Sequence, residues 1–153
     1  MPIRFLKNAS EIADVSWESP LPVRITSTER RLVQADPLLI ITLTCDTTAK
    51  DLLGSTATET ATIGNAGQYH TLIWTGVKSG TADVSYTILA RTTDLDGNPL
   101  WTGWLQLATG TITGAANTWF RVAITSPEGL YYDQYRIVVS QASGSQTLYN
   151  KIV

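Results

Sequence analysis

Two residues limit the catalytic chemistry open to this chain, because it has a single histidine and a single cysteine. Any Ser–His–Asp, Cys–His or His-based metal site would have to be built around His70, and no partner motif surrounds that residue. Cys45 ends the apolar run that begins at Pro37, so we expect a buried small hydrophobe rather than a reactive thiol. A lone cysteine also rules out an intrachain disulfide. We therefore expect no enzyme and no cofactor, although carboxylate pairs of the glycosidase type stay possible.

One short motif could hold a metal. Asp94, Asp96 and Asn98 place oxygen ligands at alternate positions, as the first half of a calcium-binding loop does. A complete loop would end in a bidentate Glu at its twelfth position, where this chain has Leu105. A hairpin loop explains Asp-Gly-Asn-Pro equally well. We expect no metal site, with these three residues as the only candidates.

A second group of residues could bind sugars by stacking. The aromatic side chains of the second half of the chain that could form such a patch are Trp101, Trp104, Trp119, Tyr131 and Tyr132. Trp101 and Trp104 are three residues apart, so in a strand they point to opposite faces unless Gly103 makes a bulge. At least one of the two is then expected in the core. The alternative for the whole set is packing in the core or at a subunit interface.

Charge and hydropathy exclude several partners. The net charge of −2 and a pI near 5.3 argue against nucleic acid, which is bound chiefly by clustered Lys and Arg. No stretch approaches the ~20 apolar residues of a membrane span, and the N-terminus lacks the apolar region of a signal peptide. We therefore expect no membrane partner and synthesis in a cytoplasm without Sec export.

The elements that must position these residues are strands. Threonine is abundant, and apolar and polar residues alternate over 82–91, 120–124 and 135–140, which puts Arg91, Arg121 and Arg136 on the water side. The stretch 69–74 alternates less cleanly and could be buried on both sides. Turns rich in Gly, Pro and Asn separate the runs. The pattern predicts an all-β fold, an antiparallel, jelly-roll-like β-sandwich of about eight strands over 38–153. The only helical candidate is a single turn over 48–53.

Residues 1–37 differ from this body and predict an extended N-terminal arm. Neither the helical nor the strand period persists there, and Pro20 and Pro22 hold the segment Pro-Leu-Pro-Val extended. Such an arm can lie across a neighbouring subunit. The alternative is an ordinary N-terminal edge strand of the same domain. The residues expected to contact another subunit or a partner protein are Phe5, Leu6, Trp17, Leu21, Pro22, Val23 and Arg24.

The run Trp17-Glu18-Ser19-Pro20-Leu21-Pro22-Val23-Arg24-Ile25, followed by a Thr-rich sandwich that ends in Tyr135-Arg136-Ile137-Val138-Val139, resembles small virion proteins of tailed bacteriophages. The resemblance is greatest to capsid decoration (cement) proteins and head fibres. It implies a non-enzymatic homo-oligomer, with a trimer favoured, that binds the major capsid protein or other virion proteins on the outer surface of the capsid. The alternative is a carbohydrate- or receptor-binding module of a phage tail or fibre.

Overall fold

The computed structural model describes residues 3–8, 11–15, 38–127 and 131–153, with side chains described from residue 38 onward. The chain divides into two compact units, Met1–Gln34 and Ala35–Val153. In the first unit, β1 (Ile3–Asn8) pairs antiparallel with β2 (Glu11–Val15), so that Ile3 lies opposite Val15. We call these two strands the N-terminal strand pair.

The N-terminal strand pair corrects part of the expectation for the arm. Residues that we expected to be irregular form a small antiparallel sheet of their own, and neither strand belongs to a sheet of the sandwich. The alternation in Ile3–Asn8 was too short to recognise. Phe5 and Leu6 lie in β1. The other expected contact residues, Trp17, Leu21, Pro22, Val23 and Arg24, lie outside the described residues.

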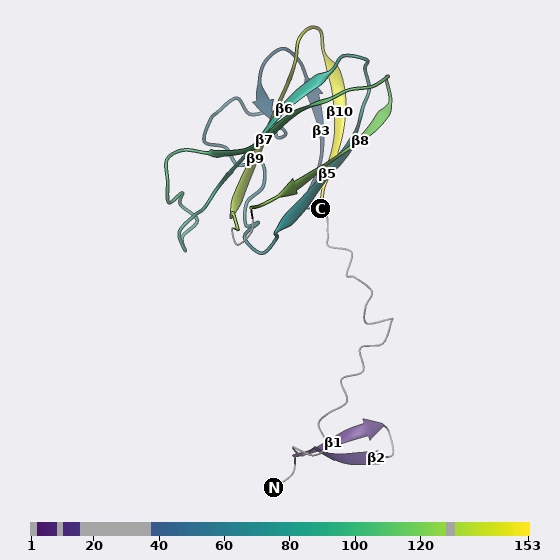
Figure 1. Ribbon diagram of the computed structural model, residues 1–153, viewed down its shortest axis with the longest axis vertical. Coiled ribbons are helices and arrows are strands. Elements are labelled where there is room, and N and C mark those ends of the chain that lie inside the picture. The colour runs from purple at the N-terminus through teal and green to yellow at the C-terminus, as the bar shows by residue number, and fades with distance from the viewer. Residues whose placement is uncertain (1–2, 9–10, 16–37, 128–130) are drawn as a thin grey trace. The chain divides into compact units, whose positions relative to one another are not determined.

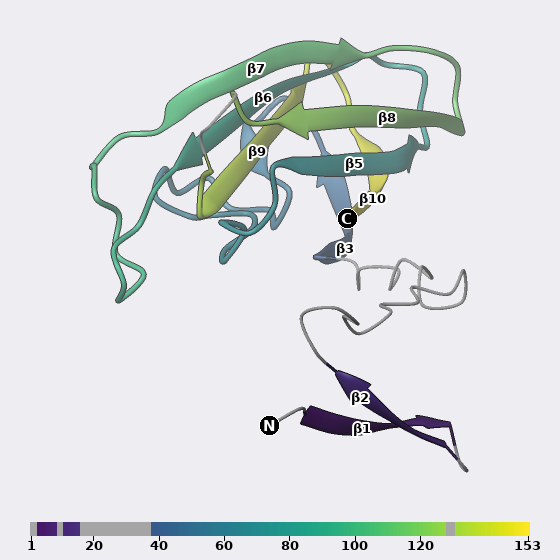
Figure 2. The same cartoon turned by 60° about the horizontal axis from the view of Figure 1, so that its bottom comes forward.

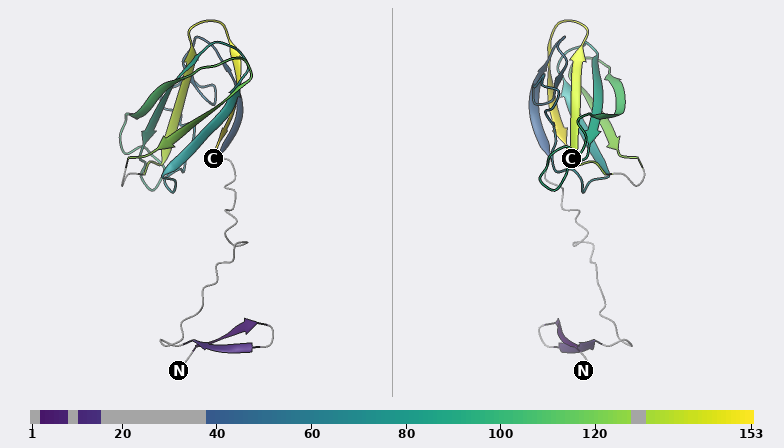
Figure 3. Two further views of the ribbon diagram at one scale, coloured as in Figure 1. Left: turned by 45° about the vertical axis from the view of Figure 1, so that its right-hand side comes forward. Right: turned by 90° about the vertical axis from the view of Figure 1, so that its left-hand side faces the viewer.

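The second unit is a β-sandwich of two four-stranded antiparallel sheets (Figures 1 and 2). One sheet, ordered β3-β10-β5-β8, consists of β3 (Leu39–Cys45), β5 (Thr71–Lys78), β8 (Thr118–Thr125) and β10 (Gln146–Ile152). The other, ordered β4-β9-β6-β7, consists of β4 (Lys50–Asp51), β6 (Val84–Arg91), β7 (Leu105–Ile112) and β9 (Gln134–Gln141). Figure 3 shows the sandwich from two further sides.

The pairing scheme is that of a jelly roll. The first strand of the sandwich pairs with its last, the second with the seventh, the third with the sixth and the fourth with the fifth, as in one long folded ribbon. Rolling this ribbon brings β10 against β5 and β6 against β9, which completes the two sheets. The prediction of an all-β, jelly-roll-like sandwich of about eight strands is confirmed.

The core lies between the two sheets, where the period-two pattern places the apolar side chains. Val84, Ile88 and Ala90 of β6 are fully buried, as are Tyr135 and Ile137 of β9. The other large apolar side chains that are fully buried are Leu52, Leu72, Trp74, Val139, Leu148 and Ile152. Strand β5 also alternates cleanly, with Thr71 exposed and Leu72 and Trp74 buried, so it is not covered on both sides as its sequence allowed.

Arg91 and Arg136 were expected to face water, and both are buried. The connection between β4 and β5 covers them. The Arg91 guanidinium donates hydrogen bonds to the Glu59 carboxylate at 2.8 Å and to the Glu59 carbonyl at 2.9 Å. The Arg136 side chain donates to the carbonyl of Thr58 at 2.9 Å. Sequence alternation assigned the face of each arginine correctly, but it carried no information about the loop that covers this face.

The helical turn expected over 48–53 does not form. Lys50 and Asp51 pair instead with Val139 and Val138 of β9. The Asp51 carboxylate accepts hydrogen bonds from the amides of Leu53 and Ser55, and Gly54 has a φ of 86°. Because a short side chain that binds nearby amides stabilises a turn rather than a helix, this segment turns sharply after a two-residue strand.

Candidate functional site

The outer face of the β3-β10-β5-β8 sheet carries two rows of side chains that cross all four strands. The strand register puts Thr42, Tyr149, Val77 and Trp119 side by side, and we call this line the aromatic row. Two residues along each strand, Ile40, Lys151, Thr75 and Arg121 form a parallel line, which we call the cation row. Successive rows on one face are roughly 6.8 Å apart, so side chains of both rows can contact one ligand.

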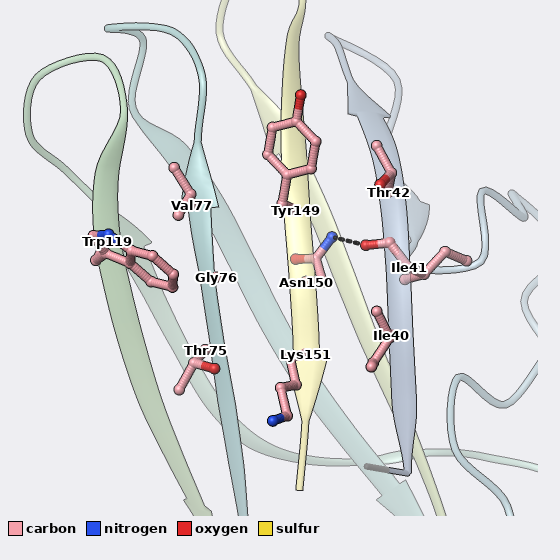
Figure 4. Close-up of a pocket in the computed structure, with 10 residues that line it drawn as sticks. All are labelled: Ile40, Ile41, Thr42, Thr75, Gly76, Val77, Trp119, Tyr149, Asn150 and Lys151. Atoms are coloured by element: carbon pink, nitrogen blue, oxygen red, sulfur yellow. Dashed lines mark hydrogen bonds between the residues drawn. The ribbon is translucent and has the colours of Figure 1, made fainter.

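A groove of about 270 Å³ lies along these rows, and Figure 4 shows the residues that line it. Trp119 on β8 and Tyr149 on β10 stand on either side of Val77 and Gly76 on β5. The groove is slightly smaller than the roughly 300–1,000 Å³ typical of pockets that enclose a small molecule. Its open form suits the flat face of a ring or a chain of rings lying across the strands.

The exposure of these aromatic rings follows from the pleat of the strands. Inward-facing Phe120 and Leu148 contribute to the core, and this forces their neighbours Trp119 and Tyr149 outward. Trp119 is 77% exposed, Tyr149 53% and Ile40 70%. Large apolar groups exposed together on one face mark an interaction site more often than scattered ones do.

Gly76 keeps the floor of the groove close to the core. Its Cα hydrogens face the Phe120 ring, and a Cβ at this position would collide with that ring and with the carbonyl oxygen of Tyr149. Phe120 in turn packs edge-on against Trp74, with ring centroids 5.1 Å apart. The absence of a side chain at Gly76 therefore lets β5, β8 and β10 come together beneath Trp119 and Tyr149.

The charge on this face has one sign. The outward-facing residues of the four strands include Lys151 and Arg121 but no Asp or Glu, although the whole chain has a net charge of −2. Among the described residues, neither of these two cations forms an ion pair. The face therefore offers aromatic rings, threonine hydroxyls and positive charge to whatever binds it.

The predicted aromatic patch does not assemble as one site. Trp119 lies at the start of β8, after the β7–β8 turn, whereas Trp101 and Trp104 lie in the β6–β7 connection. These two connections lie at opposite ends of the sandwich (Figure 2). Trp101 is 76% exposed on the connection between β6 and β7. Trp104 is half-buried, where the Arg91 guanidinium stacks 4.0 Å from its ring and its indole N–H donates to the Thr58 carbonyl. Neither tryptophan lies in a strand, so the spacing argument does not apply to them. The expectation that at least one lies in the core was wrong, because Trp104 packs against Arg91 on the outside of the sheet and not in the core.

The two tyrosines of the predicted patch also lie apart from the groove. Tyr132 is buried, and its ring meets that of Tyr135 edge-on at 6.3 Å. Tyr131 is half-exposed and packs against His70, with ring centroids 5.7 Å apart. Of the five aromatic residues singled out from the sequence, Trp119 alone contributes to the groove.

The Asp94 loop is organised by its own side chain. The Asp94 carboxylate accepts hydrogen bonds from the amides of Asp96 and Asn98, at 2.9 and 2.8 Å. The hydrogen bond from the Asn98 amide is the main reason that the pKa of Asp94 lies below its ordinary value. Gly97 takes a φ of 82°, which a turn residue other than glycine rarely adopts. Within the described residues, no cluster of three His, Cys, Asp or Glu side chains could hold a metal ion.

Cys45 is fully buried at the end of β3, as the apolar run predicted. Burial is the largest cause that raises the pKa of its thiol from 9.0 to about 11, and the nearby Asp46 carboxylate adds to the effect. The thiol is therefore protonated at neutral pH, and a protonated thiol is a poor nucleophile.

Sequence reasoning missed Tyr149, Lys151 and Ile40 as members of a site. The signal for Tyr149 was present, because Leu148 and Ile152 alternate with Tyr149 and Lys151 over the last strand. The pattern could show that these two residues face outward. It could not show that β10 lies next to β5, which is what brings Tyr149 near Trp119.

The fold and the groove define a jelly-roll β-sandwich with one exposed aromatic face of positive charge. Comparison of the chain with known protein families, curated proteins and solved structures finds no match. In the part of the chain that the structure describes, no apolar helix has the length needed to cross a membrane.

Proposed function

We propose that this protein is a non-enzymatic structural protein of a virion, a decoration protein that binds the outer surface of the major capsid lattice and stabilises the shell. The observation that carries the proposal is the division of the chain into two units, one a jelly roll and the other holding the N-terminal strand pair as a two-stranded sheet of its own. A lone pair of strands is marginally stable in water, since it can bury little apolar surface by itself. A neighbouring subunit or a capsid protein would supply the missing surface.

The fold and the charge are compatible with this role. Jelly rolls recur in viral capsid proteins and in lectins, although a fold does not by itself define a function. A net charge of −2 suits the outside of a shell, away from packaged DNA. A symmetric oligomer, with a trimer favoured, would gain avidity by contacting a repeating lattice at several points.

The test is co-sedimentation of the purified chain with shells of the major capsid protein from the same genome. We expect saturable binding by the full-length chain and at least about tenfold weaker binding by a chain that begins at Asp36, because the second lacks the strand pair. Equal binding by both chains would show that residues 1–35 do not anchor the protein to the shell. No binding by either chain would contradict the decoration role.

The groove favours a second candidate, a carbohydrate- or receptor-binding module of a tail or fibre. Trp119 and Tyr149 expose two aromatic rings on one face of the sheet, which a purely structural protein does not require. This candidate predicts that deletion of residues 1–35 leaves ligand binding intact. The two functions therefore respond in opposite ways to the same truncation.

A further inference from the structure

We propose that the groove between Trp119 and Tyr149 binds a carboxylated saccharide, whose sugar rings pack on the two aromatic side chains while Lys151 pairs with a carboxylate. This inference rests on the second candidate function and names the class of ligand for it.

The aromatic row has the geometry of a stacking platform. Trp119 and Tyr149 lie on strands β8 and β10, with β5 between them, so their backbones are about 9.6 Å apart at normal strand spacing. Val77 lies between them and forms an apolar floor at the same level (Figure 4). The C–H face of a pyranose is apolar and packs well on an aromatic ring. The two rings can therefore lie under neighbouring units of an oligosaccharide.

The polar groups around this platform match the edges of such a ligand. Thr42 and Thr75 line the groove, and their hydroxyls can both donate and accept hydrogen bonds with sugar hydroxyls. Lys151 lines the same groove beside Tyr149. Arg121 is exposed in the same row as Lys151, at the β8 edge.

The positive charge of this face favours an acidic saccharide over a neutral one. The four strands present two cations and no acid on this face, so a carboxylate gains attraction at every position along the cation row. The same argument disfavours a second copy of this chain as the occupant. Two copies stacked through this face would bring Lys151 and Arg121 of each toward those of the other, with no acidic residue between them.

The experiment measures binding of the full-length chain to a galacturonate trimer and to a sialylated trisaccharide by isothermal titration calorimetry. The carboxyl-reduced galacturonate trimer serves as the neutral control, and a glutamate peptide of equal charge as the control for electrostatics alone. We expect saturable binding of at least one acidic sugar, about fivefold weaker binding of the neutral trimer and weaker binding at high salt. Binding of both acidic probes would indicate recognition of a shared carboxylated ring.

Three variants separate the groove from the rest of the surface. Trp119→Ala should weaken the binding of the acidic sugar by about tenfold, and Lys151→Gln should weaken it by about fivefold while sparing the neutral trimer. Trp101→Ala is the matched control, because Trp101 is equally exposed but lies outside the groove. It should leave binding unchanged. Circular dichroism melting confirms that each variant is folded.

Three results would overturn the inference: no saturable binding of either acidic sugar, binding that Trp119→Ala leaves intact, or equal affinity for the glutamate peptide. Equal affinity for the glutamate peptide would indicate that this face binds an acidic protein surface instead. If the chain binds capsid shells but no acidic sugar, the saccharide site is wrong while the decoration role stands.

Discussion

At the scale of single residues, the buried Lys78 shows how a loop of this protein can satisfy a buried polar group. Lys78 is fully buried at the end of β5, and its ammonium group donates to the carbonyls of Gly80, Thr81 and Ala82 at 3.1–3.2 Å. Burial of a charge is costly unless hydrogen bonds replace those of water. Three carbonyls from the turn that leads into β6 meet this requirement, so Lys78 holds that turn in place.

Replacement of Lys78 by Met tests this role. The variant keeps a side chain of similar length but removes the donor to three carbonyls, of which that of Ala82 keeps a hydrogen bond from the Gln146 side chain. We expect the free energy of unfolding to fall by about 2–4 kcal/mol. Urea denaturation measures the loss. Lys151→Met is the matched control, because Lys151 is partly exposed, and it should change stability by no more than about 0.5 kcal/mol. An equal loss in both variants would show that the buried hydrogen bonds of Lys78 do not stabilise the fold more than an exposed lysine does.

The thiol of Cys45 gives a prediction that depends on pH. Its pKa of about 11 lies above the ordinary 9.0, so between these values the unfolded chain loses a proton that the folded chain keeps. Stability from this group is therefore complete below pH 9 and falls as the pH rises toward 11. At pH 8 the thiolate is about a hundredfold rarer in the folded chain, so alkylation by iodoacetamide should be at least about a hundredfold slower than in urea. Comparable rates would mean that Cys45 is open to solvent.

At the scale of elements, β5 is the strand on which the candidate site depends. It pairs with β10 on one side and β8 on the other, and these two strands carry Tyr149 and Trp119. Its inner face buries Leu72 and Trp74, and the Trp74 indole donates to the Asn150 side chain of β10 at 3.0 Å. These core contacts of β5 therefore determine where the strands that carry Trp119 and Tyr149 lie.

Gly76→Ala tests how closely these strands must approach. The added methyl group would collide with Phe120 and with the backbone of Tyr149, so we expect a loss of about 1–3 kcal/mol in the free energy of unfolding. Gly64→Ala is the control, since a Cβ there meets no atom within 4 Å. Thermal or urea unfolding of the two variants gives the comparison. A neutral result for Gly76→Ala would show that both Phe120 and the β10 backbone at Tyr149 can shift without cost.

At the scale of the whole molecule, the sandwich supplies its own core. The buried apolar residues of the described chain run from Leu43 on the first strand of the jelly roll to Ile152 on its last. Pairing of these two terminal strands closes the roll, because Leu39 lies opposite Ile152. We therefore expect the sandwich to keep its stability without a further segment.

A chain that begins at Asp36 should therefore fold alone. We expect one cooperative transition with a Tm within about 3 °C of that of the sandwich in the full-length chain, because no sandwich pairing is lost. Differential scanning calorimetry of both chains measures this. A large drop in Tm would mean that residues 1–35 contribute to the core of the sandwich.

The sequence by itself determined the class of fold and the inward face of most strands. These properties are local, since they follow from period-two alternation and from turns rich in Gly, Asn and Pro. It also predicted the burial of Cys45.

Only the tertiary structure decided which outward-facing residues become neighbours. Trp119 and Tyr149 are far apart in the sequence, and they share a groove because the ribbon rolls until β10 lies against β5. Arg91 is buried because a distant loop brings Glu59 over it. Strand order and loop cover depend on contacts between distant segments. Alternation along one strand assigns each side chain to a face of the sheet, but it does not say which strand lies beside it. It therefore cannot predict such contacts.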